Sequence, residues 1–300
     1  MSRRMVIFGC GYVGRALAEV AAVSGWEVWI HSRNAESLAA VGVVPPERRI
    51  VADLHSDAWH DRLHGPVEAA INLVSSAGNG LEGYELSYLE GNRSIARWAE
   101  KRAVRRFLFT SATSVYPQTD GSRVTEADVP ADPEDLSPNG RVLRQAETEI
   151  LANTVFPERM VLRLGGIYGP GRHLYLDRLR KGENVIPGEG GDFLNLVHRD
   201  DIVAALLAAL RLRKWPPPAC YNVVDDAPAP KAEIAAWLAQ RLGVPVPRFD
   251  PALAGRRSRR RRIGGRFPNR RVDNGAFRDL TGWEPRHPDF RSGYQELLEG

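Results

Sequence analysis

Three glycines at the end of a short apolar strand restrict the fold of this chain more than any other feature of its sequence. The segment Val6-Ile7-Phe8-Gly9-Cys10-Gly11-Tyr12-Val13-Gly14 has the spacing G-x-G-x-x-G. Residues 5–8 are expected to form the strand, and residues 15–23 have the pattern of a helix. In this context the motif predicts a phosphate-binding loop, and the alternative is a Gly-rich turn in another kind of α/β domain.

Each glycine of this loop has its own expected role. Gly9 allows the tight turn, Gly11 lets the backbone approach a pyrophosphate, and Gly14 lets the helix pack closely on the strand. The amides of the first helical turn and the positive end of the helix dipole would face the phosphates. We therefore expect a dinucleotide to contact the loop at Gly9, Gly11, Tyr12, Val13 and Gly14.

Apolar runs and helical stretches alternate through the first half of the chain. The apolar runs are residues 28–30, 50–51, 69–74, 107–109 and 160–164. The helical stretches between them are residues 35–40, 88–101 and 142–153. This alternation predicts an α/β protein with a Rossmann-like, doubly wound parallel sheet.

The second half is richer in Pro and Gly, from Tyr168 onward. It predicts a helix over residues 202–212 with Asp201 as its N-cap, a strand over 221–224 and a helix over 231–242. We expect a cofactor-binding domain of residues 1–167, to which 195–224 return, and a smaller C-terminal α/β substrate lobe of 168–194 and 225–300. The reacting end of the dinucleotide is expected between the two.

The composition is that of an ordinary globular protein. Of the 300 residues 43% are hydrophobic, and no apolar run approaches the roughly 18 residues of a membrane span. Cys10 and Cys220 are too few for a disulfide framework, which favours a reducing, cytoplasmic location. Cys10 is expected to be a small buried side chain rather than a nucleophile.

The net charge of +4 is placed unevenly, because one dense run holds six arginines. They are Arg256, Arg257, Arg259, Arg260, Arg261 and Arg262. Such a run fits a solvated loop, a clamp for a phosphorylated substrate or a nucleic-acid contact. The absence of interleaved aromatic residues disfavours nucleic acid as a partner.

The end of the second expected strand bears on the choice of dinucleotide. NAD-binding sites of this kind usually place an acidic residue there, on the ribose 2′-hydroxyl. This chain has Ser32, Arg33 and Asn34 instead, and a guanidinium can bind a phosphate with two hydrogen bonds. We therefore predict NADP rather than NAD, the alternative being that Arg33 only starts a surface helix. Asp53 and Leu54, after the third strand, are expected to contact the adenine.

His60 and His64 are the one metal-like pair in the sequence, with the i, i+4 spacing of zinc ligands on a helix. No Glu follows His60 and no third ligand is evident, so no metal site is predicted.

Four later motifs, together with the glycine loop, resemble the extended short-chain dehydrogenase/reductases, the NAD-dependent epimerase/dehydratase family. The resemblance covers residues 6–294. The motifs are Tyr88-Leu89-Glu90-Gly91-Asn92, Thr110-Ser111-Ala112-Thr113-Ser114-Val115-Tyr116, Arg163-Leu164-Gly165-Gly166-Ile167-Tyr168-Gly169-Pro170-Gly171, and Val197-His198-Arg199-Asp200-Asp201 with Tyr221-Asn222-Val223. By this resemblance, further cofactor contacts are Val74, Ser75, Ser76, Ser111, Leu164, Gly165, Gly166 and Ile167.

The residues that move a proton in this family are missing at the matching positions. Aligned on Ser137-Pro138, the Tyr and Lys positions are Asn139 and Leu143, and the Ser/Thr position is Ala112. No Y-x-x-x-K occurs anywhere in the chain. Tyr116 and Thr113 are the candidate catalytic substitutes, and Arg141 or Arg144 could steady an oxyanion or a substrate phosphate. The tighter glycine spacing, with Gly282-Trp283-Glu284-Pro285 near the end, indicates an atypical subgroup of bacterial epimerase-like proteins that lacks the Tyr-x-x-x-Lys pair.

Two functions follow. The first is an NADP-dependent oxidoreductase or epimerase-like enzyme with a rearranged proton relay, acting on a small molecule that is nucleotide-linked, phosphorylated or already poised for reduction. The second is a non-catalytic NADP(H)-binding sensor. The resemblance also allows a homodimer formed through residues 88–101 and 142–153.

Overall fold

The computed structural model describes residues 3–76, 80–173, 175–253 and 266–299. The chain forms two compact units. The first consists of Met1–Ala112, Val142–Arg163 and Val203–Tyr221, and the second of Thr113–Arg141, Leu164–Ile202 and Asn222–Gly300. The predicted division into a cofactor domain and a substrate lobe concerns function and stays a prediction. The arginine run at 256–262 lies outside the described residues.

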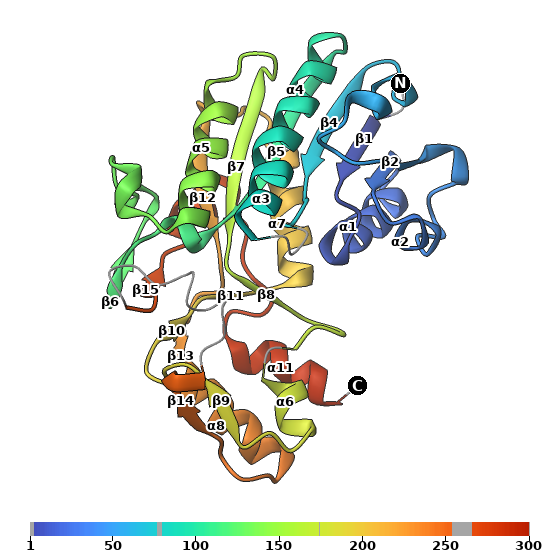
Figure 1. Cartoon of the computed structure of the whole chain (residues 1–300). Coiled ribbons are helices and arrows are strands. Elements are labelled where there is room, and N and C mark those ends of the chain that lie inside the picture. The colour runs from blue at the N-terminus through green and yellow to red at the C-terminus, as the bar shows by residue number, and fades with distance from the viewer. Residues whose placement is uncertain (1–2, 77–79, 174, 254–265, 300) are drawn as a thin grey trace. The chain divides into compact units, whose positions relative to one another are not determined.

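The first unit is built on a seven-stranded sheet with the order β12-β7-β5-β4-β1-β2-β3 (Figure 1). The pairs β1–β2, β1–β4, β2–β3 and β4–β5 are parallel. The strands are β1 (Arg3–Phe8), β2 (Trp26–Ser32), β3 (Arg49–Val51), β4 (Val67–Asn72), β5 (Val104–Ala112), β7 (Glu158–Leu164) and β12 (Ala219–Val223). The strand order reverses between β1 and β4, so the predicted doubly wound sheet is confirmed.

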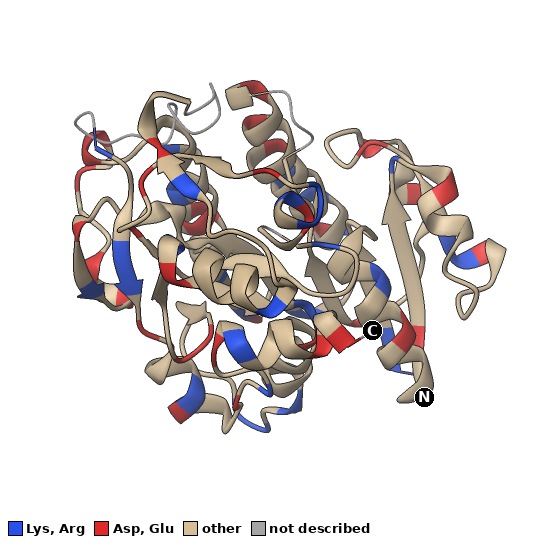
Figure 2. Cartoon of the chain, turned by 90° about the horizontal axis from the view of Figure 1, so that it is seen from below, with Lys and Arg blue, Asp and Glu red and all other residues tan. Residues whose placement is uncertain are grey.

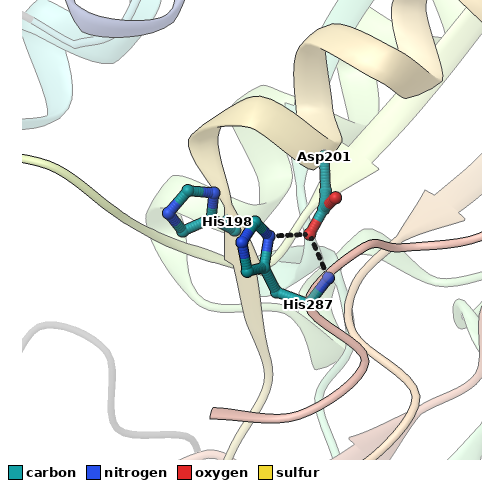
Figure 3. A group of neighbouring side chains, drawn as sticks. All are labelled: His198, Asp201 and His287. Atoms are coloured by element: carbon teal, nitrogen blue, oxygen red, sulfur yellow. Dashed lines mark hydrogen bonds and ion pairs between the residues drawn. The ribbon is translucent and has the colours of Figure 1, made fainter. Parts of the chain in front are cut away.

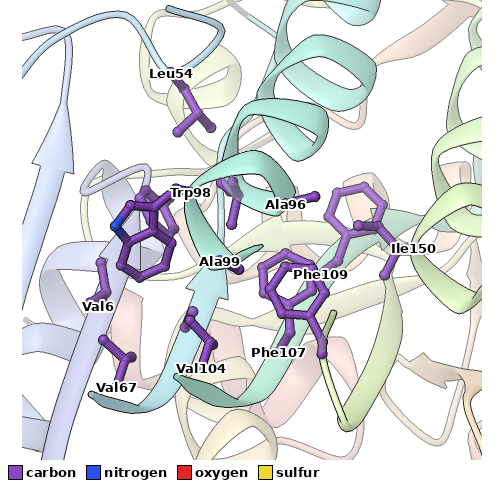
Figure 4. Close-up of a cluster of buried hydrophobic side chains, with 14 of the residues drawn as sticks. Val6, Leu54, Val67, Ala96, Trp98, Ala99, Val104, Phe107, Phe109 and Ile150 are labelled. Atoms are coloured by element: carbon purple, nitrogen blue, oxygen red, sulfur yellow. The ribbon is translucent and has the colours of Figure 1, made fainter. Parts of the chain in front are cut away.

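Helices pack on both faces of this sheet. They are α1 (Tyr12–Val23), α2 (Ala35–Ala39), α3 (Gly80–Tyr84), α4 (Gly91–Glu100), α5 (Pro138–Ala152) and α7 (Arg199–Arg211). On one face, apolar residues of α4 and α5 form a common core with alternate residues of the strands (Figure 4). Phe107 stacks there on Phe156, with ring centroids 4.3 Å apart, and Trp98 is buried against Phe8. Burial of large aromatic rings stabilises this face most per residue.

Two helix starts differ from the prediction. The helix expected from residue 88 is preceded by a π-helical turn, η3 (Glu85–Glu90), before α4 begins at Gly91. Asp201 was predicted to be an N-cap, and this is wrong, because α7 already begins at Arg199 and Asp201 lies in its first turn. Its carboxylate instead accepts backbone N–H groups of Arg286 and His287, a distant segment that the local pattern could not reveal.

In the part of the chain that the structure describes, the second unit has four short strand pairs and several helices. The pairs are β8 (Gly166–Tyr168) with β11 (Leu196–His198), β9 (Val185–Pro187) with β14 (Arg248–Asp250), β10 (Phe193–Leu194) with β13 (Ala229–Pro230), and β6 (Thr119–Val124) with β15 (Asn269–Val272). The helices are α6 (Leu176–Arg180), α8 (Lys231–Leu242), α10 (Gly275–Thr281) and α11 (Phe290–Glu299). Its core joins α6, α8 and α11 through residues such as Leu176, Leu238 and Phe290. Among the described residues, no helix is both long and apolar enough to cross a membrane.

Candidate cofactor site

The loop between β1 and α1 has the geometry that its glycines predict. Gly9 has a φ of +88°, and a Cβ on it would lie 2.6 Å from the backbone nitrogen of Val74. A Cβ on Gly14 would collide with the carbonyl oxygen of Gly9. The backbone N–H groups of Gly9 and Cys10 both donate to the carbonyl of His31 at 3.0 Å. The first and third glycines are therefore required by the packing of the protein itself.

Gly11 differs from its two neighbours in the motif. A Cβ on Gly11 would meet no heavy atom within 4 Å, so this side of the loop is open. The first turn of α1, which Gly11 precedes, contains no acidic residue. An open backbone at the positive end of a helix dipole suits a phosphate group. The open space at Gly11 is the feature that fits the diphosphate of a dinucleotide.

Cys10 lies in the same loop but is fully buried. Burial raises the pKa of its thiol to about 12, so the reactive thiolate is scarce at neutral pH. Its role is to fill space beneath the loop.

The end of β2 brings four of the predicted cofactor residues together. The Ser32 hydroxyl accepts the backbone N–H of Asn34, whose side chain caps α2 by accepting from Ser37. The Arg33 guanidinium lies 3.8 Å from the carboxylate of Asp53, and both side chains are more than half exposed. Leu54, by contrast, is 5% exposed and belongs to the hydrophobic core. An exposed Arg33 can exchange this weak ion pair for a ligand phosphate.

The segment after β4 is held by buried amides that the sequence analysis did not assign. Asn72 accepts the backbone N–H of Val74 at 3.0 Å and donates to Asn92 at 2.7 Å. The backbone N–H of Ser76 donates to the Tyr88 hydroxyl at 3.3 Å, and Ser75 is exposed. These contacts fix the position of the predicted 74–76 segment. The sequence feature that could have indicated these contacts is Asn72, a polar residue at the end of an apolar strand.

Ser111, near the end of β5, carries a hydroxyl that is buried and has no hydrogen-bond partner among the described residues. The neighbouring Thr110 hydroxyl is satisfied by the carbonyl of Asn72 at 3.0 Å. A buried polar atom without a partner is costly, and a ligand can satisfy it. Ser111 therefore fits its predicted contact with a cofactor.

The candidate catalytic residues Thr113 and Tyr116 belong to the second unit. Tyr116 is fully buried and donates its hydroxyl to the Asn222 side chain at 2.7 Å. Asn222 donates in turn to the carbonyl of Asp273 at 2.9 Å. The carbonyl of Thr113 accepts from the buried guanidinium of Arg270 at 2.6 Å. Sequence reasoning placed Asn222 in a family motif without giving it a role and missed Arg270, because both residues act across long stretches of chain.

The predicted nicotinamide segment 164–167 also lies in the second unit. The backbone N–H of Gly165 donates to the carbonyl of Val223, and that of Gly166 to the carbonyl of Asn195. A Cβ on Gly165 would lie 2.8 Å from the same Asn195 oxygen, so this glycine is required by close backbone packing. Leu164 is buried and Ile167 half-buried.

Asn139, Leu143 and Glu147 follow one another at intervals of one turn along helix α5. Asn139 is half-buried, and Leu143 is fully buried. One turn later, the buried Glu147 accepts two hydrogen bonds from Arg163, at 2.9 and 2.7 Å. Asn139 carries an amide and Leu143 a hydrocarbon, and neither group exchanges a proton near neutral pH.

A cluster of two histidines and an aspartate lies in the second unit (Figure 3). His198, Asp201 and His287 are buried and each offers a ligand atom within 4.8 Å of the others. The Asp201 oxygens, however, already accept from Nδ1 of His287 at 2.9 Å and from two backbone N–H groups. We assign this carboxylate to holding the segment before α11, not to a metal.

His60 and His64, in contrast, contact different partners. The imidazole of His60 lies 3.1 Å from the Ser94 hydroxyl, whereas His64 lies beyond the end of η2 (Asp57–Arg62), next to Arg102.

His31 gives the first unit a predictable sensitivity to acid. Its ring is buried beside Phe8 and Trp59, and neither ring nitrogen has a partner among the described residues. Burial lowers its pKa to about 4. Because the folded-state pKa lies below the ordinary value, the neutral ring stabilises the fold above pH ~6.5, and this contribution is lost as the pH falls, by about 2 kcal/mol at pH 5.

We therefore expect His31→Leu to flatten the pH dependence of unfolding by urea between pH 7 and pH 5. The measurement is the difference in unfolding free energy between the two pH values, in the natural protein and in the variant. Equal differences in the two proteins would contradict the assignment to His31.

Comparisons with known proteins agree with this geometry. The sequence profile of the NAD dependent epimerase/dehydratase family matches residues 5–223. The 3-diazoavenalumate denitrifying reductase of a Streptomyces species is 32% identical over 218 residues, which cover 68% of this chain and 68% of that protein. Protein YeeZ of Escherichia coli K12 is 29% identical over 255 residues, which cover 84% of this chain and 88% of that protein. The structure of DesIV, a dTDP-glucose 4,6-dehydratase from Streptomyces venezuelae with NAD bound, has a TM-score of 0.81 at 19% identity and covers 99% of this chain and 96% of its own.

Proposed function

The chain belongs to the NAD-dependent epimerase/dehydratase family, and from that premise we propose that it is an NADPH-dependent reductase of a small molecule that is already electrophilic, such as an imine or an activated double bond. Support comes from the sequence, which contains no Y-x-x-x-K and, when aligned on Ser137-Pro138, has Asn139 and Leu143 at the positions of the family's Tyr and Lys. By this proposal the protein belongs to an atypical subgroup with a non-standard active site.

The chemistry of such a substrate explains why the pair can be absent. NADPH, when bound, supplies the hydride. Reduction of a C=N bond consumes this hydride and one proton, and yields NADP⁺ and an amine. The tuned Tyr–Lys pair is needed to remove or deliver a proton at a hydroxyl or carbonyl oxygen. A substrate that is protonated in solution, or that accepts its proton from water, needs no such pair. The name of the Streptomyces relative, a reductase of a diazo compound, supports this class of substrate.

The residues of the chain would then bind and orient rather than exchange protons. The open loop at Gly11 would hold the diphosphate, and the buried Ser111 hydroxyl would contact the cofactor. Thr113 and Tyr116 would shape the reacting end. The Tyr116 hydroxyl already donates to Asn222, which supports a positioning role for this residue.

The test is oxidation of NADPH, followed by its absorbance, with panels of imines, activated alkenes, diazo compounds, carbonyls and nucleotide sugars. Turnover on an electrophilic panel supports the proposal. Tight NADPH binding without turnover on any panel would favour the second candidate, a non-catalytic NADP(H) sensor. The predicted homodimer is tested separately by sedimentation of the same protein.

Replacing Tyr116 by Phe is expected to change kcat by less than about fivefold. The hydroxyl is buried and bonded to Asn222, so its removal should loosen the Thr113–Tyr116 turn without removing a proton donor. The measurement is kcat from steady-state kinetics, on a substrate that the NADPH-oxidation panels identify. A fall of more than about a hundredfold in kcat, with NADPH affinity retained, would instead assign the proton transfer to Tyr116.

Replacing Arg33 by Ala is expected to weaken NADPH binding by at least about tenfold and NADH binding by less than about threefold. Arg33 follows the strand end that faces the adenosine ribose in this fold, and only NADPH carries a 2′-phosphate. Titration calorimetry with both coenzymes gives the two ratios. The control is Arg62→Ala, an exposed arginine of the same unit. Equal weakening of both coenzymes would refute the contact with the 2′-phosphate.

A further inference from the structure

The first unit contains a cavity of about 500 Å³ at the amino-terminal ends of the central strands of its sheet. Residues at the starts of β1, β4 and β5 and before β7 line it. Four of them are arginines: Arg3, Arg4, Arg102 and Arg105. Apolar side chains such as Val104 and Pro157 form the remaining walls. The cavity thus combines positive groups with a hydrocarbon surface, in the size range of small-molecule sites.

Two of the four arginines are neutralised by carboxylates. Arg4 forms an ion pair with Glu27 at 2.9 Å, and Arg105 forms one with Glu68, which also lines the cavity, at 3.1 Å. These two pairs hold the walls in place and leave little net charge of their own.

Arg3 and Arg102 have no such partner, because no carboxylate of the described residues lies within ion-pair distance of either. The guanidinium of Arg102 donates to the carbonyls of Leu63 and Lys101, at 3.0 and 2.8 Å. The guanidinium of Arg3 lies 4.1 Å above the ring of Trp26. Elsewhere, basic and acidic residues are interspersed along the elements (Figure 2). Arg3 and Arg102, two of the residues that line the cavity, therefore carry positive charge that no carboxylate of the described residues offsets.

This cavity is separate from the cofactor loop. The strand β1 begins at Arg3 beside the cavity and ends at Phe8, directly before Gly9. Six residues of strand span roughly 17–20 Å. A ligand in the cavity would therefore lie at the opposite end of β1 from the loop that we assign to NADPH.

We propose that this cavity is a second binding site, for a small organic anion with an apolar body: a carboxylate or a phosphate carried on a hydrocarbon or aromatic group. Arg3 and Arg102 bind the anionic head, for which the planar guanidinium is suited. The apolar walls receive the body of the ligand, whose burial adds affinity and selects against inorganic anions. The site does not depend on the reaction proposed above.

The first test is binding of 8-anilinonaphthalene-1-sulfonate, an aromatic anion whose fluorescence rises in apolar sites. We expect saturable binding with one site per chain that persists in the presence of saturating NADPH. The double variant Arg3→Gln/Arg102→Gln should weaken it at least about tenfold, and Arg62→Gln should leave it unchanged. Unaltered thermal unfolding of both variants shows that the fold is retained, as expected from the exposed or half-buried positions of these arginines. Displacement by NADPH, or undiminished binding by the double variant, would overturn the proposal.

The second test identifies the head group. Phenyl phosphate and an aryl carboxylate compete with the fluorescent anion in separate titrations, with inorganic phosphate as the control. We expect at least one aromatic anion to compete more than about tenfold better than inorganic phosphate, and the better of the two names the head group. Equal competition by inorganic phosphate would show that the apolar walls contribute nothing and would refute the proposed ligand class. Fluorescence of Trp26 gives an independent signal, because Arg3 lies over its ring.

Discussion

Replacing Gly11 by alanine is expected to leave the fold intact and to weaken NADPH binding at least about thirtyfold. The new Cβ would meet no protein atom within 4 Å, and the φ at this position is negative, outside the left-handed region that requires glycine. The methyl group would instead occupy the space where the diphosphate approaches the backbone. Titration calorimetry with NADPH measures the loss of affinity, and thermal unfolding measures whether the fold is retained.

The matched control is Gly14→Ala in the same loop. Its Cβ would collide with the carbonyl oxygen of Gly9, so the helix must move away from the loop. We expect this variant to lose about 1–3 kcal/mol of stability, the usual cost of overpacking. The added methyl group should therefore weaken NADPH binding at Gly11 without lowering the stability of the fold. At Gly14 the same methyl group should lower the stability of the fold first. If Gly11→Ala bound NADPH as well as the natural protein does, the loop would not be the diphosphate site.

The glycine loop and the sheet could be predicted from sequence because their signals are local. Gly9, Gly11 and Gly14 lie within six consecutive residues, and each predicted strand is indicated by its own apolar run. The parallel order follows from the alternation of these runs with helices, since right-handed crossovers leave few arrangements. The structure bears out these elements, with strand ends shifted by a few residues.

What the sequence could not supply are pairings between distant residues. Asp201 looks like an N-cap because it precedes an apolar helix, but its carboxylate binds a segment 85 residues away. Tyr116 looks like a catalytic substitute because it ends a family motif, but its hydroxyl finds Asn222, 106 residues away. Periodicity in the sequence does not indicate such partners, because it reports only on residues within the same helix or strand. The preference for NADP and the catalytic roles stay predictions for the same reason, since both need a ligand beside Arg33 or Thr113.

The Glu147–Arg163 pair leads to the largest expected effect on stability. Both side chains are at most 2% exposed, and two hydrogen bonds join them. Arg163→Met removes the partner that makes both hydrogen bonds and leaves the buried carboxylate with only the longer ion pair to Arg144, at 3.6 Å. We expect a loss of about 3–5 kcal/mol in the free energy of unfolding, measured with urea.

The double variant Glu147→Leu/Arg163→Met separates the cost of an unpaired charge from the loss of packing. With both charges removed, most of the stability should return, because an apolar pair of similar volume often replaces a buried ion pair without loss. A double variant as unstable as Arg163→Met would contradict this account. The same helix face carries Leu143 one turn earlier, so α5 has its only buried charge turned toward Arg163 in the fold. By our proposal, α5 is the helix that would carry the proton relay of the family, and in this chain it serves packing instead, which is why we look for a substrate that needs no relay.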